Sequence, residues 1–122
     1  GIRLLMVDDD PLNQFVNQKL LSLHGAEVQL AGSGVEAIRK LQEQTFDAVL
    51  MDVSMPVLDG YETTRQIRAN KNIPACPVIA LTAHVVSGER ERCLSAGMDD
   101  YLSKPFEIEE LVDVVLKHVQ SE

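Results

Sequence analysis

The feature that most constrains the fold is the alternation of short apolar runs with amphipathic helical patterns along the whole chain. The runs contain few polar side chains, as is typical of strands that are buried on both faces of a parallel sheet. Such strands are expected at residues 2–7, 27–31, 46–51, 77–81 and 101–102. Five strands that alternate with five helices predict right-handed crossovers and an open α/β sheet, parallel throughout, with helices on both faces.

Capping residues and breakers mark where the intervening helices begin and end. Ser or Asp before the first turn caps free backbone N–H groups, Pro fits the first helical position, and Gly closes a helix. The expected helices are Pro11 to Gly25 after Asp10, one opened by Ser33 and Glu36, Asp59 to Ile67, Ser87 to Ala96 closed by Gly97, and Ile108 to Val119. In the first helix much of an apolar set at helical spacing is expected to face the core: Leu12, Phe15, Val16, Leu20 and Leu23.

Length and composition limit what the chain can be. Residues 1–122 fit a single domain, and the start at Gly1, almost directly before an apolar run, is expected of a segment excised from a longer protein. The net charge is −8 and no long Lys/Arg run is present, so direct nucleic-acid binding is not expected. No apolar stretch approaches the roughly 20 residues that span a bilayer. We therefore expect a cytoplasmic segment without membrane contact, which is compatible with a parent protein anchored in the inner membrane.

Polar side chains follow four of the expected strands directly. They are Asp8 and Asp9 after the first strand, Asp52 after the third, Thr82 after the fourth and Lys104 after the fifth. In an open parallel sheet, ligands bind outside the carboxyl ends of the strands. Each residue alone has an ordinary role as a cap, a turn residue, a strand end or a solvated cation. All of them at one edge of one sheet indicate a functional site.

Three carboxylates at one edge predict a bound cation. Like charges repel unless a cation is present, and hard oxygen ligands suit Mg²⁺, which keeps several waters and binds phosphate oxygens. With Mg²⁺, one carboxylate can act as a nucleophile while the metal and a lysine stabilise the equatorial oxygens of a phosphoryl group. A threonine hydroxyl can donate one more hydrogen bond to that group. These residue types therefore point to phosphoryl transfer.

Four segments carry these polar residues. They are LLMVDD at 4–9, DAVLMDVSMPVLDG at 47–60, VIALTA at 78–83 and YLSKP at 101–105. Together they resemble the receiver (response-regulator) family of two-component systems, and the resemblance covers essentially the whole chain. An MPxxDG loop after an aspartate is nearly diagnostic of that family. The resemblance implies a flavodoxin-like fold with the strand order 2-1-3-4-5.

The resemblance also implies a role for each site residue. Asp52 would be the phosphoacceptor, Asp9 a direct Mg²⁺ ligand and Asp8 a mainly water-mediated one. The backbone carbonyl of Ser54 would be the remaining protein ligand of the metal, and Lys104 would pair with the phosphoryl group.

A second set of residues would report phosphorylation. By resemblance, Thr82 would swing toward modified Asp52, and the ring of Tyr101 would turn inward as Thr82 moves. The peptide bond between Lys104 and Pro105 would be cis and would aim the lysine into the site. His84 lies at a position that influences how long the aspartyl phosphate lasts, and a solvated histidine is its expected state.

The motifs in three further segments are most similar to those of receivers in hybrid histidine kinases. These segments are residues 10–14, 81–84 and 96–101. Such a domain would take a phosphoryl group from a phosphohistidine and pass it to a histidine phosphotransfer domain, or switch its Tyr101 face. It would catalyse only its own phosphorylation and dephosphorylation. The partner, a histidine kinase or a histidine phosphotransfer domain, would dock near the first helix, where Leu12 and Phe15 offer an apolar patch. A monomer is favoured, and a free-standing or transcription-factor receiver is the alternative.

Two other classes of protein fit the sequence less well. One is a phosphatase with an Asp nucleophile, and the other is a cofactor binder with the same fold. A phosphatase of this kind needs a second Asp two residues after Asp52 as general acid and base, where Ser54 stands. A flavodoxin-like cofactor binder needs a phosphate-cradling loop after the first strand, where three carboxylates would repel a flavin phosphate. A degenerate receiver is disfavoured by the full set of site residues.

Overall fold

The computed structural model describes residues 2–83 and 88–119 and contains the expected parallel sheet. The strand order is β2-β1-β3-β4-β5, which confirms the predicted order, and every neighbouring pair is parallel. Each strand lies within two residues of its expected position. The strands are β1 (Arg3–Val7), β2 (Glu27–Ala31), β3 (Ala48–Asp52), β4 (Val78–Thr82) and β5 (Asp100–Ser103).

The five helices follow the predicted capping pattern except at one start. They are α1 (Pro11–Leu23), α2 (Gly34–Glu43), α3 (Gly60–Ala69), α4 (Glu89–Ala96) and α5 (Ile108–Val119). The side chains of Asp10, Ser33 and Asp59 each accept a hydrogen bond from the first turn of their helix. The expected start of α4 at Ser87 is wrong, because Gly88 has a left-handed φ of 92° and the helix begins after it. None of the helices within the described ranges has the length and apolar character needed to cross a bilayer.

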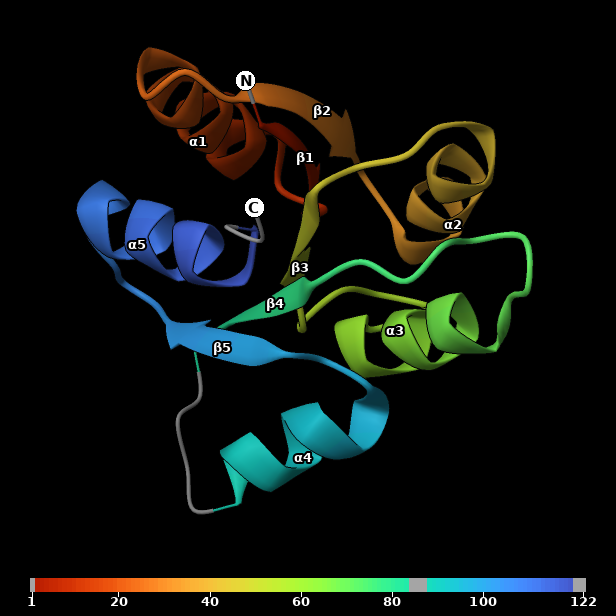
Figure 1. Cartoon of the computed structure of the whole chain (residues 1–122). Helices are drawn as coiled ribbons and strands as arrows, with labels where there is room; N and C mark the ends of the chain where they lie inside the picture. Colours follow the sequence, from red (N-terminus) through yellow and green to blue (C-terminus); the bar gives the residue numbers. More distant parts are fainter. Residues whose placement is uncertain (1, 84–87, 120–122) are drawn as a thin grey trace.

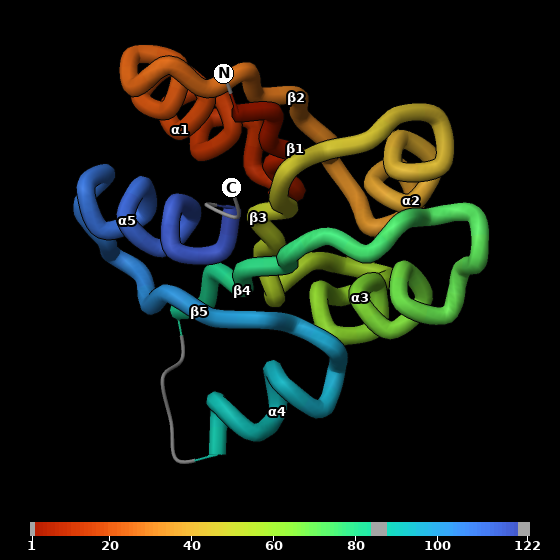
Figure 2. The backbone as a smooth tube through the Cα atoms, viewed as in Figure 1, coloured from red at the N-terminus to blue at the C-terminus, as the bar shows by residue number. Residues whose placement is uncertain are grey.

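The sheet divides the interior into two separate cores. Helices α1 and α5 cover one face, and α2, α3 and α4 cover the other (Figures 1 and 2). Successive strand side chains point to opposite faces, so Leu4 and Met6 of β1 belong to the core under α1 and α5, while Leu5 and Val7 belong to the other. β1, β3 and β4 are therefore apolar on both faces, as the continuous runs predicted.

The apolar set of α1 does not pack as expected. Leu12, Phe15 and Leu23 are 68%, 58% and 82% exposed, and Leu21 is the buried residue of the helix, so the expectation that much of this set faces the core is wrong. Two glutamines of the same helix point inward instead. Gln14 Nε2 donates to the carbonyls of Asp8 and Ala31, and Gln18 Nε2 donates to the carbonyl of Val28. These amide groups attach α1 to the backbone around β1 and β2, and its outer face is left apolar.

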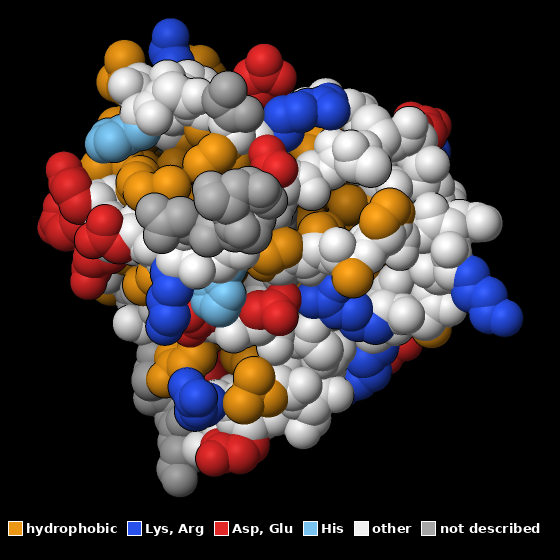
Figure 3. Space-filling model, in the orientation of Figure 1, with side chains coloured by type: hydrophobic (Ala, Val, Ile, Leu, Met, Phe, Trp, Pro, Cys, Tyr) orange, Lys and Arg blue, Asp and Glu red, His pale blue; other side chains and the backbone are white. Residues whose placement is uncertain are grey.

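A second apolar feature lies at the other end of the strands from the polar residues of the site. Figure 3 shows hydrophobic side chains gathered between α1 and α5 on the face in view. They surround a cavity of about 270 Å³ that is lined by Ile2, Leu4, Leu21, Ala26, Val112, Val115 and Leu116, with His24 and Gly25.

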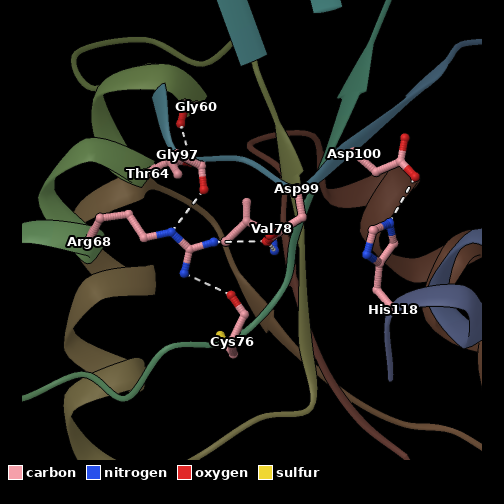
Figure 4. A network of polar contacts seen from close by, with 9 residues as sticks. All are labelled: Gly60, Thr64, Arg68, Cys76, Val78, Gly97, Asp99, Asp100 and His118. Atoms are coloured by element: carbon pink, nitrogen blue, oxygen red, sulfur yellow. Dashed lines mark hydrogen bonds and ion pairs between the residues drawn. The ribbon is translucent and has the colours of Figure 1, made fainter. Parts of the chain in front are cut away.

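One arginine ties α3 to the start of β4 and to the turn before β5 (Figure 4). Arg68 donates to the carbonyls of Gly97 and Cys76, both at 2.8 Å, and to Asp99 Oδ2 at 2.9 Å. The same carboxylate oxygen accepts from the backbone N–H of Val78, the first residue of β4. The forked guanidinium thus donates to two carbonyls and one carboxylate at the same time. Among the described residues, no other side chain in this network joins these three groups.

We expect Arg68→Lys to lower the free energy of unfolding by about 1–2 kcal/mol, because one ammonium group cannot replace three divergent N–H donors. Urea unfolding followed by circular dichroism measures the change. Arg65→Lys on the same helix is the control, since Arg65 makes an exposed pair with Glu62 that contributes less than about 1 kcal/mol. Equal losses in both variants would contradict the role given to Arg68.

Candidate phosphoryl-transfer site

Three carboxylates converge at the carboxyl edge of the sheet. Asp8 follows β1, Asp9 comes next, and Asp52 is the last residue of β3, the central strand. One carboxylate oxygen from each lies within 4.8 Å of the others. Asp8 and Asp52 are buried, and Asp9 is exposed. The predicted cluster is therefore formed by the fold, with two of its members withdrawn from water.

The two carboxylate oxygens of Asp8 have different surroundings. Its Oδ1 accepts from the backbone N–H of Asp10 at 2.9 Å, whereas its Oδ2 is buried and has no hydrogen-bond partner among the described residues. Burial raises the pKa of Asp8 above its ordinary value of 3.8, and the charges of Asp52 and Asp9 raise it further, against the Asp10 N–H and Lys104. A buried orphan oxygen beside two other carboxylates fits a hard divalent cation well.

Asp52 is held by one group from the loop that follows it and by one from the segment after β5. Its Oδ1 accepts from the backbone N–H of Ser54 at 3.1 Å, and Lys104 Nζ lies 3.4 Å from the same oxygen. The peptide bond between Lys104 and Pro105 is cis, as the resemblance implied. The Lys104 backbone N–H donates to the carbonyl of Thr82 at 2.7 Å, which joins the end of β5 to the end of β4. Asp52, Lys104 and Thr82 are thereby brought to one edge.

The two expected switch residues lie on neighbouring strands beside this site. Thr82 is buried at the end of β4, and Tyr101 is half-buried on β5 opposite Ala80. Tyr101 packs against the core that α2, α3 and α4 cover. His84, named from the sequence as a neighbour of the acceptor site, lies outside the described residues.

The loop after Asp52 is closely packed at one end and strained at its tip. A Cβ on Gly60 would lie 2.5 Å from the Asp52 carbonyl oxygen, so only glycine allows α3 to begin this close to β3. At the tip, Leu58 N–H donates to the Pro56 carbonyl at 2.7 Å and closes a three-residue turn around Val57. Val57 has a φ of +67° and is fully exposed. A β-branched residue in this conformation is strained.

The structure adds a polar cavity that the sequence did not indicate. It holds about 530 Å³ beside the acceptor and is lined by Val53, Ser54, Met55, Asp59, Tyr61, Thr82, Glu89 and Arg92. Across it, the hydroxyl of Tyr61 on α3 donates to the carboxylate of Glu89 on α4. In the sequence, Tyr61 is one residue of an expected helix and Glu89 is one of several charged residues in a row, so neither indicated a site. Only the packing of α3 on α4 brings these residues, 28 positions apart, together.

Comparison with known proteins agrees with the fold and shows the family. The family model for the response regulator receiver domain matches residues 4–116, and the chain belongs to this family. The sensor protein GacS of Pseudomonas syringae pv. syringae is 46% identical over 118 residues, which cover 94% of this chain and 13% of that protein. The chain thus spans about one eighth of the length of this relative.

Two solved structures are informative about the site. The receiver domain of the sensor histidine kinase PA1611 from Pseudomonas aeruginosa PAO1, with magnesium coordinated in its active-site cleft, has a TM-score of 0.90 and 46% identity, with 99% of both chains covered. The receiver domain of the response regulator Ssk1, in complex with the Saccharomyces cerevisiae histidine phosphotransfer protein Ypd1, has a TM-score of 0.88 and 28% identity, with 98% of this chain and 90% of that one covered.

We expect Asp8→Asn to raise the free energy of unfolding without Mg²⁺, since it removes a buried charge but keeps an acceptor for the Asp10 N–H. The folded-state pKa of Asp8 is raised, so its charge penalises the folded state at any pH above that pKa. The advantage of Asn should therefore vanish as the pH falls toward 3.8 and wild-type Asp8 becomes protonated. Thermal unfolding over a pH series measures this.

Added Mg²⁺ should reverse the order of the two proteins. A cation that binds only the folded state stabilises the wild type, and Asp8→Asn should lose most of that gain. Asp113→Asn, which removes an exposed charge on α5, is the control and should follow the wild type in both arms. An Asp8→Asn protein that is less stable than wild type without Mg²⁺ would contradict the electrostatic account of the cluster.

Proposed function

We propose that this domain is a phosphoacceptor in a two-component phosphorelay and that Asp52 receives the phosphoryl group from a phosphohistidine. The single observation that carries the proposal is the convergence of three carboxylates with Lys104 on buried Asp52. In the reaction a carboxylate oxygen of Asp52 forms a bond to phosphorus, and the bond from phosphorus to the donor's imidazole nitrogen breaks. The bonding pair stays on that nitrogen, and the product is an acyl phosphate.

The surrounding residues hold the acceptor and balance charge. The N–H of Ser54 and the ammonium group of Lys104 fix one oxygen of Asp52, so its orientation is set before a donor arrives. Because the Lys104 ammonium group lies 3.4 Å from Asp52 Oδ1, it can also pair with the phosphoryl oxygens. Thr82, at the end of the neighbouring strand, can donate its hydroxyl to a phosphoryl oxygen.

Asp8, Asp9, Asp52 and the backbone carbonyl of Ser54 are the groups we assign to a Mg²⁺ ion. The unpartnered buried oxygen of Asp8 and the all-oxygen donor set support this choice. A bound Mg²⁺ supplies the positive charge that lets three carboxylates and a phosphoryl group share one site. The magnesium in the PA1611 receiver, which is 46% identical, supports the same assignment.

The readout we propose uses Thr82 and Tyr101. Movement of Thr82 toward modified Asp52 would vacate space at the end of β4, and the half-buried ring of Tyr101 on β5 is placed to turn into it. This change would alter the surface made by α4, β5 and α5. The two positions of one ring would then report whether Asp52 is modified.

The relatives support an origin in a hybrid sensor histidine kinase. The chain is 46% identical to part of GacS and to the receiver domain of the sensor kinase PA1611. We therefore propose that residues 1–122 are the receiver portion of a longer kinase and act in the cytoplasm. In that setting Asp52 would accept from the kinase and pass the group to a histidine phosphotransfer domain, as the complex of Ypd1 with the Ssk1 receiver suggests.

The exposed face of α1 is the surface we assign to that partner. Leu12, Phe15 and Val16 lie at i, i+3 and i+4, so they form one apolar stripe toward solvent. A groove of about 260 Å³, lined by Asp8, Asn13, Asn17, Lys104, Pro105 and Phe106, leads from α1 to the acceptor. Val57 offers another exposed apolar contact from the loop after Asp52. A helical partner seated on the stripe could present its histidine through the groove.

Incubation with acetyl phosphate and Mg²⁺ tests the acceptor. We expect wild type to gain one phosphoryl group, seen as +80 Da by intact mass and released by hydroxylamine, which cleaves acyl phosphates. Asp52→Asn should gain none, and chelation of Mg²⁺ should abolish the gain in wild type. Asp113→Asn should behave as wild type. Labelling of Asp52→Asn to the wild-type level would refute the proposed acceptor.

The docking surface is tested with a phosphorylated histidine phosphotransfer protein as donor. Phe15→Ala should slow transfer to Asp52 at least tenfold, since buried aromatic anchors commonly carry much of an interface's affinity. The same variant should react with acetyl phosphate at the wild-type rate. Leu94→Ala is the control, because Leu94 is also a large exposed apolar residue but lies on α4. Equal slowing by both variants, or by neither, would refute the assignment of α1.

A further inference from the structure

A buried polar pair joins α3 to α4 beside the acceptor, and the reaction outlined above does not use it. Tyr61 and Glu89 are 5% and 4% exposed, and the tyrosine hydroxyl donates to Glu89 Oε2. Cys93 Sγ approaches the same oxygen at 3.6 Å. Burial is the larger cause and the neighbouring Glu89 the smaller one, and together they raise the pKa of the Tyr61 hydroxyl. The same two causes raise the pKa of the Cys93 thiol to about 11. Both groups therefore keep their protons and act as donors to Glu89.

One end of the pair is fixed to the backbone of the acceptor. Tyr61 directly follows Gly60, whose N–H donates to the carbonyl of Val53 at 3.2 Å. Gly60 also packs so closely on the Asp52 carbonyl that a Cβ has no room there. The start of α3, and with it Tyr61, therefore cannot shift without moving the strand end that carries Asp52.

The other end belongs to the segment that follows Thr82. Glu89 is the first residue of α4, seven positions after Thr82, and Thr82 and Glu89 line the same cavity of about 530 Å³. Gly88, which precedes Glu89, has a left-handed φ of 92°, and no atom of the described residues lies within 4 Å of a Cβ position there. Within residues 2–83 and 88–119, no side chain caps the start of α4 by a hydrogen bond. Among the described side chains, Tyr61 is thus the one whose hydrogen bond ties the beginning of α4 to α3.

We propose that Tyr61 and Glu89 are positioning residues that hold the start of α4 against α3, beside the acceptor, in the arrangement of the unmodified protein. The inference rests on the proposed function and deepens it. Any displacement of α4 that accompanies movement of Thr82 toward modified Asp52 must lengthen or break this bond. The pair therefore opposes phosphorylation energetically, and its strength sets how readily the domain responds.

Tyr61→Phe isolates the effect of the hydroxyl. The ring remains, and so does the stacking of the Arg92 guanidinium, which lies 4.2 Å from its centroid. Loss of a hydrogen bond to a charged group corresponds to roughly a tenfold change in an equilibrium constant. The apparent dissociation constant of a ligand that selects the other arrangement falls by that factor while the unmodified arrangement dominates.

The measurement is the affinity for beryllofluoride, a phosphoryl mimic, in the presence of Mg²⁺, by calorimetry or fluorine NMR. Tyr61→Phe should bind it roughly tenfold more tightly than wild type, although the metal-free variant unfolds more easily. Glu89→Gln, which keeps an acceptor for the hydroxyl but loses the charge, should bind with an affinity between those of wild type and Tyr61→Phe. In the double variant the two effects should not add, because Glu89→Gln weakens the same bond that Tyr61→Phe removes.

Thr64→Val is the matched control. Thr64 is a buried α3 residue whose hydroxyl donates to the carbonyl of Gly60 within the same helix. Its loss should lower stability without changing beryllofluoride affinity, so a merely structural effect and a positioning effect are separated.

The outcomes also separate this inference from the proposed function. If wild type fails to bind beryllofluoride with Mg²⁺, the proposed acceptor chemistry is wrong. If wild type binds it but Tyr61→Phe binds no more tightly, or Thr64→Val gains as much, the positioning role is overturned. Glu89→Gln supplies the same test should Tyr61→Phe not fold.

Discussion

The crowding of negative charge at the end of a buried sheet is the constraint on which the rest of the site depends. Asp8, Asp9 and Asp52 have oxygens within 4.8 Å of one another, and one buried oxygen of Asp8 has no partner in the part of the chain that the structure describes. Such an arrangement is costly in isolation, so the fold must hold it in place. The fold does so through apolar strands that end at fixed positions. It also places Lys104 against Asp52. The unfavourable free energy of this arrangement favours binding of a cation and a phosphoryl group, because the two together complete the charge balance.

Much of this arrangement was predictable from the sequence because it depends on where strands end. Parallel strands bring their carboxyl ends to one edge, so the polar residues after them had to meet, and the structure brings Asp8, Asp52, Thr82 and Lys104 there. The faces of α1 were not predictable in the same way. Apolar spacing indicated that much of one set packs inward, yet Gln14 hydrogen-bonds to backbone near the strand ends, and Phe15 stays in solvent. Periodicity reveals a stripe but not which way it faces.

Contacts between distant helices were beyond the sequence for a different reason. Nothing near Tyr61 signals a buried carboxylate partner, and Glu89 lies in a strongly polar helix. Their meeting depends on how close α3 comes to the sheet, which Gly60 decides by having no side chain. The start of α4 was misplaced because a left-handed Gly88 looks, in sequence, like any glycine near a helix end. These features depend on packing distances between helices and the sheet, which cannot be predicted from a short stretch of sequence.

The division of the interior into two cores has a consequence for how such a domain can diversify. Because adjacent strand residues serve opposite faces, the layer under α1 and α5 and the layer under α2, α3 and α4 share backbone but few side chains. A substitution in one layer therefore has little effect on side-chain packing in the other layer. Recognition of a partner on α1 and adjustment of α4 can then evolve almost independently. A single acceptor can keep its chemistry while its specificity and its sensitivity are tuned on opposite sides of the same strand.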